Sequence, residues 1–147
     1  MKRFVFLFCA LSCVASTSFA DTDAAAPATV TTPSGLQYIE HVVGDGEIAK
    51  TGDTVTVEYT GWIQQPDGSK GLEFDSSRPP GRPIEFRLGR RQVIKGWEEG
   101  ITGMRVGGKR TLIVPSALAY GRRGLGDIVL PNQNLIFEVE LVAIKRK

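Results

Sequence analysis

The sequence has few of the residues that enzymes use for covalent, acid–base or metal chemistry. It contains two cysteines, Cys9 and Cys13, and one histidine, His41, which lies in a candidate strand. A structural zinc site needs about four clustered ligands, usually Cys and His, so a zinc site is excluded. A Ser-His-Asp triad is formally possible, but the chain has no Gly-x-Ser-x-Gly elbow. We interpret His41 as a lone surface side chain and expect no metal ion or cofactor.

Two other sequence patterns suggest nucleotide binding and acid–base catalysis, but the residues around them argue against both. Residues 103–109 fit the phosphate-loop pattern G-x-x-x-x-G-K, but Arg110 follows, where such a loop needs Ser or Thr to hold a magnesium ion. A strand is also predicted to follow this loop, where nucleotide binding requires a helix. The adjacent Glu98 and Glu99 would point in different directions on a helix, so they form a poor acid–base pair. We predict that both glutamates lie on a solvated face.

The N-terminus has the pattern of an export signal. Lys2 and Arg3 precede an apolar run over residues 4–11, and the segment Ser18-Phe19-Ala20 offers a small-x-small cleavage site. A basic start, a short apolar run and such a site are typical of a secretory signal peptide. The apolar run is too short to span a bilayer as a helix. We therefore predict a signal peptide over residues 1–20 and a periplasmic location.

Cys13 suggests an alternative cellular location. The segment Ala10-Leu11-Ser12-Cys13 loosely resembles a bacterial lipoprotein cleavage site. Acylation of Cys13 would anchor the protein to a membrane, and full secretion is a further alternative. After cleavage at Ala20, the mature chain would have no cysteine, and hence no disulfide in an oxidising compartment.

The charge balance excludes binding to nucleic acid or anionic lipid through the net charge of the chain. The full chain carries 18 basic and 16 acidic residues. Loss of Lys2 and Arg3 with the signal lowers the basic count to 16, so the mature chain would be formally neutral. No general attraction to nucleic acid or anionic lipid follows. The basic segment 145–147 is predicted to be a solvated tail.

The remaining chain has the length of one domain. Residues 21–34 are rich in Ala, Thr and Pro, and this composition predicts a flexible leader because it cannot bury enough apolar surface. Residues 35–147 form the predicted domain, with no internal repeat.

Alternation of apolar and polar residues predicts half-buried strands. It is clear over residues 53–60, 84–88 and 135–142, and weaker over residues 36–43 and 109–114. Links rich in Pro, Asp and Gly separate these segments and indicate turns.

One short helix is predicted among the strands. Val93, Trp97 and Ile101 recur at helical spacing on one face, while Gly96 weakens the helix and Gly100 limits it. One helix with about five strands predicts an α+β fold, in which a curved antiparallel sheet wraps over the helix.

Three short stretches combine apolar walls with few polar groups. They are Phe74-Asp75-Ser76-Ser77, residues 93–97 (VIKGW) and Ala119-Tyr120-Gly121. Such a mixture is typical of an apolar cleft with a few orienting hydrogen-bonding groups. Aromatic residues are also commonly buried for packing alone, so each residue taken singly could belong to the core.

The order and spacing of these stretches resemble the FKBP-type peptidyl-prolyl cis/trans isomerases. The likeness runs from about Gly35 to Lys145 and includes residues 57–61 (VEYTG), 74–78 (FDSSR) and 92–100 (QVIKGWEEG). It implies a bent sheet over one helix with the binding cleft between them, an X-Pro bond as substrate, and no cofactor. It also implies proline-containing polypeptide clients and ligands of the tacrolimus or rapamycin type. We expect a monomer.

The resemblance implies a role for each cleft residue. Trp97 would form the floor beneath the substrate proline, while the Ile94 N–H and the Tyr120 hydroxyl would bind the substrate carbonyls. Asp75 would be the one charged group of the cleft. The implied catalytic residues are Asp75, Tyr120, Ile94 and Trp97, and the implied substrate-binding residues are Tyr59, Phe74, Ile84, Phe86, Gln92, Val93, Ile128, Val129 and Phe137.

Several residues depart from the family pattern. Ile84 stands where a second Phe is common, Gln92 replaces a common Glu, and Pro80 lies where some members place an Arg near the cleft aspartate. These differences should tune sequence preference while leaving the floor and the donors intact. They also leave open a second hypothesis, a chaperone or binding module that uses the same cleft without turnover.

Overall fold

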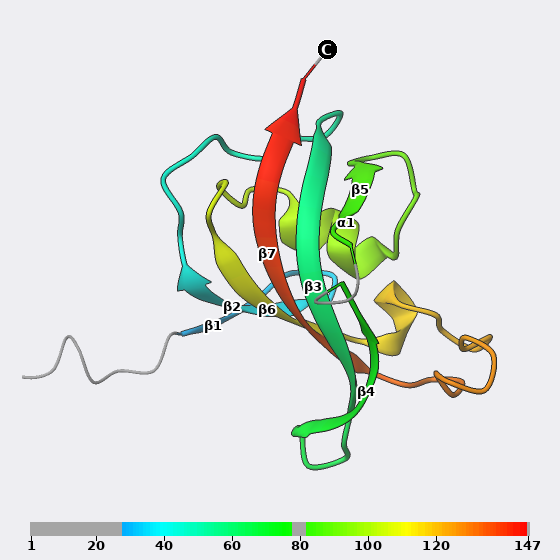
Figure 1. Cartoon of the computed structure of the whole chain (residues 1–147). Coiled ribbons are helices and arrows are strands. Elements are labelled where there is room, and N and C mark those ends of the chain that lie inside the picture. The colour runs from blue at the N-terminus through cyan, green and yellow to red at the C-terminus, as the bar shows by residue number, and fades with distance from the viewer. Residues whose placement is uncertain (1–27, 78–81, 147) are drawn as a thin grey trace, which may run out of the picture.

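The computed structural model describes residues 28–77 and 82–146 (Figure 1). The predicted signal peptide, the first part of the predicted leader, Cys13 and Pro80 lie outside the described residues. Within them, no helix is long and apolar enough to cross a membrane.

An antiparallel sheet of seven strands dominates the part of the chain that the structure describes. Its order is β1-β2-β6-β7-β3-β4, and β5 also pairs with β3. The long strands β3 and β7 lie side by side at its centre and curve around the helix α1 (Figure 1). The strands are β1 (Thr29–Thr31), β2 (Gln37–Val42), β3 (Thr54–Gln64), β4 (Lys70–Ser76), β5 (Ile84–Arg87), β6 (Lys109–Val114) and β7 (Leu135–Lys145); the helices are α1 (Lys95–Ile101) and the 3-10 turn η1 (Ser116–Leu118).

This architecture confirms the predicted α+β fold, with more strands than the five expected. The two that the pattern missed, β1 and β4, lie at the ends of the main strand order. Both have largely exposed side chains, so neither shows the alternation that burial on one face imposes. β1 also falls inside the segment expected to be a flexible leader, where it pairs with β2.

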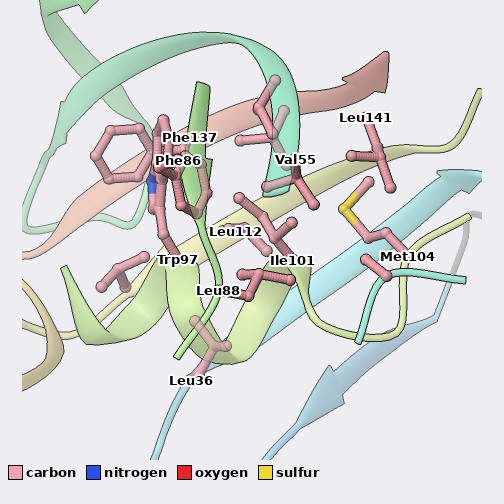
Figure 2. Close-up of a cluster of buried hydrophobic side chains, with 14 of the residues drawn as sticks. Leu36, Val55, Phe86, Leu88, Trp97, Ile101, Met104, Leu112, Phe137 and Leu141 are labelled. Carbon is pink, nitrogen blue, oxygen red and sulfur yellow. The ribbon is translucent and has the colours of Figure 1, made fainter. Parts of the chain in front are cut away.

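The core lies between the concave face of the sheet and α1. Alternate residues of β3, β6 and β7 point inward, which is the pattern that the sequence predicted for the central strands. Figure 2 shows an aliphatic end around Met104 and Leu141 and an aromatic end around Trp97, Phe86 and Phe137. The fully buried side chains include Leu36, Leu88, Ile101, Met104, Leu112, Leu135, Leu141, Val55, Val57 and Val114.

Two helix glycines allow α1 to approach β6 closely. A Cβ atom on Gly96 would lie 2.5 Å from Val114 Cγ1, and one on Gly100 would lie 2.7 Å from Leu112 Cδ2. Both partners are fully buried, so neither can move aside easily. The glycines that weaken the helix in the sequence therefore serve its packing.

Lys145 and Arg146, in the segment predicted to be a solvated tail, are exposed but do not form a free tail. Lys145 lies in β7 and its Nζ is 2.9 Å from Glu85 Oε2. The Arg146 guanidinium donates to Asp53 Oδ1 at 3.1 Å, to Glu47 Oε2 at 2.9 Å and to the Ile48 carbonyl at 2.9 Å. The hydrogen bonds from Arg146 and from the Lys50 N–H lower the pKa of Asp53. This end of the chain is fixed to the loop before β3.

Gly96→Ala should destabilise the fold by about 1–3 kcal/mol, because the added methyl group overpacks against Val114. In an isolated helix the same change from glycine to alanine would instead stabilise the helix, by roughly 1 kcal/mol. Urea unfolding of the wild type, Gly96→Ala, Val114→Ala and the double variant measures both terms. The double variant should lose less stability than the two single losses added together. Additive losses would show that the two side chains do not compete for space.

Candidate functional site

An apolar cleft of about 180 Å³ opens between the sheet and the N-terminal end of α1. Strands β3, β4, β5 and β7 contribute its walls. The loop before α1 forms one edge, and Tyr120, two residues after η1, forms the other. The lining residues are Tyr59, Phe74, Asp75, Ile84, Gln92, Val93, Ile94, Trp97, Tyr120 and Phe137. Ten of the thirteen residues implied by the resemblance therefore meet in one place.

Trp97 forms the floor of this cleft. Its ring meets Tyr59 edge-on, with centroids 4.8 Å apart and planes at 77°, and Phe137 likewise at 5.3 Å and 85°. Phe86 packs against it at 5.9 Å. Edge-to-face contacts of this kind favour the observed orientation of the rings. Trp97 is 4% exposed, and its accessible part lines the cleft.

Phe74 and Tyr59 extend the aromatic surface upward from the floor. Phe74 meets Phe137 edge-on at 5.7 Å and 79°. Gly61, opposite Asp75 in the β3–β4 pair, leaves room for both phenylalanine rings, because a Cβ there would lie 2.7 Å from Phe137 and 2.9 Å from Phe74. The glycine in the VEYTG segment is thus required by the cleft wall.

The Asp-Ser-Ser segment joins β4 to β3 beside the cleft. The Tyr59 N–H donates to Ser77 Oγ at 2.7 Å, and the Ser77 N–H donates to the Tyr59 carbonyl at 2.9 Å. The Tyr59 hydroxyl donates to Asp75 Oδ2 at 2.6 Å, and Asp75 Oδ1 accepts from the Ser76 N–H at 2.9 Å. The sequence indicated Asp75 as a cleft residue, but it gave no sign that Ser77 fixes the backbone of Tyr59.

Several hydrogen-bond donors at the cleft have no partner among the described residues. They include the backbone N–H of Ile94, which is the N-cap of α1, the hydroxyl of Tyr120 and the buried Nε1–H of Trp97. Burial, followed by the negative charge of Asp75, raises the pKa of Tyr120. Burial and the hydrogen bond to Asp75 likewise raise the pKa of Tyr59. Both phenols therefore remain protonated donors at neutral pH.

Glu98 fixes the loop that carries the cleft residues before α1. Its carboxylate accepts from the Gly89 N–H at 2.6 Å and from the Arg91 N–H at 3.1 Å. The Arg87 N–H also donates a hydrogen bond to Gln92 Oε1 at 2.8 Å. Glu98 and Glu99 are both partly exposed, and Glu99 also accepts a hydrogen bond, from Ser34 Oγ at 2.6 Å. An acidic residue in the first helical turn after a Gly-containing loop was the available signal.

The structure places the other three predicted residues away from the cleft wall. Phe86 is buried and contacts Trp97 from the core. Val129 is fully buried, and its carbonyl accepts from the Leu125 N–H at 2.8 Å, which closes the loop on itself. Ile128 is 53% exposed in the same loop. In this conformation Val129 supports the loop from within.

His41 lies on the opposite face of the sheet, as its interpretation as a surface residue predicts. Its Nε2 is 2.7 Å from Thr111 Oγ1, and it borders a depression of about 290 Å³ shared with Lys109, Glu138 and Glu140. Although larger than the cleft, this depression is lined mainly by charges. In residues 28–77 and 82–146, no three His, Cys, Asp or Glu side chains cluster so as to hold a metal ion.

Comparisons with known proteins agree with this geometry. Residues 45–142 match the family model for the FKBP-type peptidyl-prolyl cis-trans isomerase. The chain is 48% identical over 101 residues to the FK506-binding protein of Neisseria meningitidis serogroup A, covering 69% of this chain and 88% of that one. It is 49% identical over 114 residues to FK506-binding protein 4 of Dictyostelium discoideum, covering 78% of this chain but only 29% of that one.

A solved structure has a similar fold. The crystal structure of FkpA from Escherichia coli superposes with a TM-score of 0.70 at 42% identity, covering 80% of this chain and 51% of that chain.

Glu98→Ala should loosen the loop over residues 88–92, because two backbone N–H groups lose a charged acceptor. Hydrogen exchange followed by NMR should show the amides of Gly89 and Arg91 exchanging at least about ten-fold faster. Glu99→Ala is the matched control, because Glu99 bonds to Ser34 and should leave both amides unchanged. Equal protection in Glu98→Ala and wild type would contradict the assigned role.

Proposed function

The chain belongs to the FKBP-type peptidyl-prolyl cis-trans isomerases, and from this membership we propose that it accelerates X-Pro rotation in exported proteins and so assists their folding. The observation that supports this most strongly is the placement of Trp97. Its ring lies at the base of a cleft walled by Tyr59 and Phe137, whose size and apolar lining suit a pyrrolidine ring.

The proposed mechanism follows from the electronic structure of the amide. The planar peptide bond resists rotation by about 18–20 kcal/mol because of C–N resonance. At the twisted transition state this resonance is lost, and the amide becomes less polar than in its planar form. An apolar cleft therefore stabilises the twisted form relative to water, and this difference in binding lowers the barrier. No covalent intermediate or proton transfer is required.

The unpartnered Ile94 N–H and Tyr120 hydroxyl complete the proposed mechanism. The Ile94 N–H and the Tyr120 hydroxyl lie at the cleft, where carbonyl groups on either side of the proline can accept from them. Fixing these carbonyls holds the chain still while the prolyl bond turns. Asp75 accepts a hydrogen bond from the Tyr59 hydroxyl, and this bond fixes the orientation of the Tyr59 ring beside Trp97.

We also propose the periplasm as the place of action and the same cleft as the site for macrolides of the tacrolimus or rapamycin type. The N-terminal sequence pattern supports the first proposal. Family membership supports the second.

Trp97→Leu and Tyr120→Phe should each lower kcat/KM on an X-Pro peptide, the first by at least about ten-fold and the second by roughly two- to ten-fold. Asp75→Leu should also lower it, because Tyr59 loses its acceptor. A protease-coupled assay measures activity, and circular dichroism checks that the fold survives. Trp62→Leu is the matched control, because Trp62 lies on the outer face of the sheet beneath Lys70.

Full activity in all three cleft variants would dispose of the assignment. Suppressed aggregation of a client without any turnover on the peptide would instead identify a chaperone that uses the same cleft.

The mass of the mature protein, purified from the exporting cell, should correspond to an N-terminus at Asp21. This result is expected because Ser18-Phe19-Ala20 supplies the cleavage site. A diacylglyceryl group on an N-terminal Cys13 would replace the soluble periplasmic form with an anchored one. A Cys13→Ala variant is the control, since it removes only the lipoprotein route.

A further inference from the structure

The loops beside the cleft carry a concentration of positive charge that the isomerase reaction itself does not use. We call this the basic rim and define it as Arg90, Arg91, Lys95, Arg122 and Arg123. All five are exposed, and none has an ion-pair partner within residues 28–77 and 82–146. The chain as a whole is close to neutral, with 18 basic against 16 acidic residues. The rim is therefore a local feature.

The rim residues adjoin the cleft through the backbone. Arg91 precedes the lining residue Gln92, and Lys95 follows Ile94. Arg122 is two positions after Tyr120, so its Cα lies within about 8 Å of the tyrosine Cα. Figure 1 shows the loop before α1 and the loop after η1 on the same side of the sheet as the helix.

Acidic side chains near the cleft offset this charge only in part. Glu58 and Glu138 alternate with inward-facing residues of β3 and β7, so they lie on the outer face. Glu98 and Asp75 keep their negative charge, because their hydrogen-bond donors are neutral, but within the described residues neither carboxylate forms an ion pair with a rim side chain. The loop after η1 carries one acidic residue, Asp127, against Arg122 and Arg123, and all three are exposed.

From this arrangement we propose that the basic rim selects clients with acidic residues flanking the prolyl bond. The inference rests on the proposed function, because it concerns the polypeptide bound in the same cleft. A cleft of about 180 Å³ holds little more than the proline, so the residues on either side must pass over the loops. A concentration of one sign of charge attracts the opposite sign and raises the rate of encounter.

The preference should appear in kcat/KM on matched peptides. Each peptide carries Glu, Gln or Lys at one position, two residues before or two residues after the prolyl bond. At about 0.1 M salt, Glu should exceed Lys by roughly five-fold at one or both positions. At about 1 M salt the Debye length falls to about 3 Å, and the difference should nearly vanish.

Arg122→Gln/Arg123→Gln should reduce the ratio of Glu to Lys by about half or more. The matched control is Lys50→Gln/Lys109→Gln, which removes the same charge from exposed positions outside the cleft and should leave the ratio unchanged. Equal kcat/KM for Glu, Gln and Lys at both positions would overturn the proposal, and so would a ratio that responds equally to both double variants.

Failure of the rim proposal can be told apart from failure of the proposed function. Turnover of the Gln peptide tests the isomerase alone, whereas the ratio of Glu to Lys tests the rim. If no peptide is turned over, fluorescence anisotropy of the labelled peptides still measures binding. Tighter binding of the Glu peptide that weakens in Arg122→Gln/Arg123→Gln supports the rim, and equal affinities overturn it.

Discussion

The close contact between α1 and β6 is the constraint on which the site depends. Gly96 and Gly100 allow the helix backbone to lie against Val114 and Leu112, and this depth brings Trp97 under the concave face of the sheet. The tryptophan then packs edge-to-face with Tyr59 and Phe137 and lines the cleft. A helix held further away would leave the aromatic end of the core without its floor.

The same elements that stabilise the domain also orient its binding groups. Ser77 forms hydrogen bonds with both the N–H and the carbonyl of Tyr59, and these bonds join the end of β4 to β3. At the same place, the Asp75 carboxylate accepts a hydrogen bond from the Tyr59 hydroxyl. Glu98 holds the loop that carries Gln92 while belonging to the helix that carries Trp97. The cleft is thus built from groups whose positions are fixed by neighbours, and it can bind a distorted substrate without first ordering itself.

The sequence predicted the elements whose burial repeats regularly, and it missed those fixed by single contacts. Alternation identified β3 and β7, because burial on one face imposes a period of two. It missed β4, whose side chains are mostly exposed, and it could not separate Val129 from Ile128, since both are apolar and only the closed loop buries one of them. Ten of the residues that the family likeness implied lie together around the cleft.

The position of β7 in the sheet has a consequence for biosynthesis. This strand pairs with both β3 and β6, although its residues come after all the other described strands in the chain. A nascent polypeptide that has not yet extended through residues 135–145 lacks the central partner of both strands, and it also lacks Phe137. Folding of the earlier segments alone therefore cannot complete the cleft before this C-terminal strand has been synthesised.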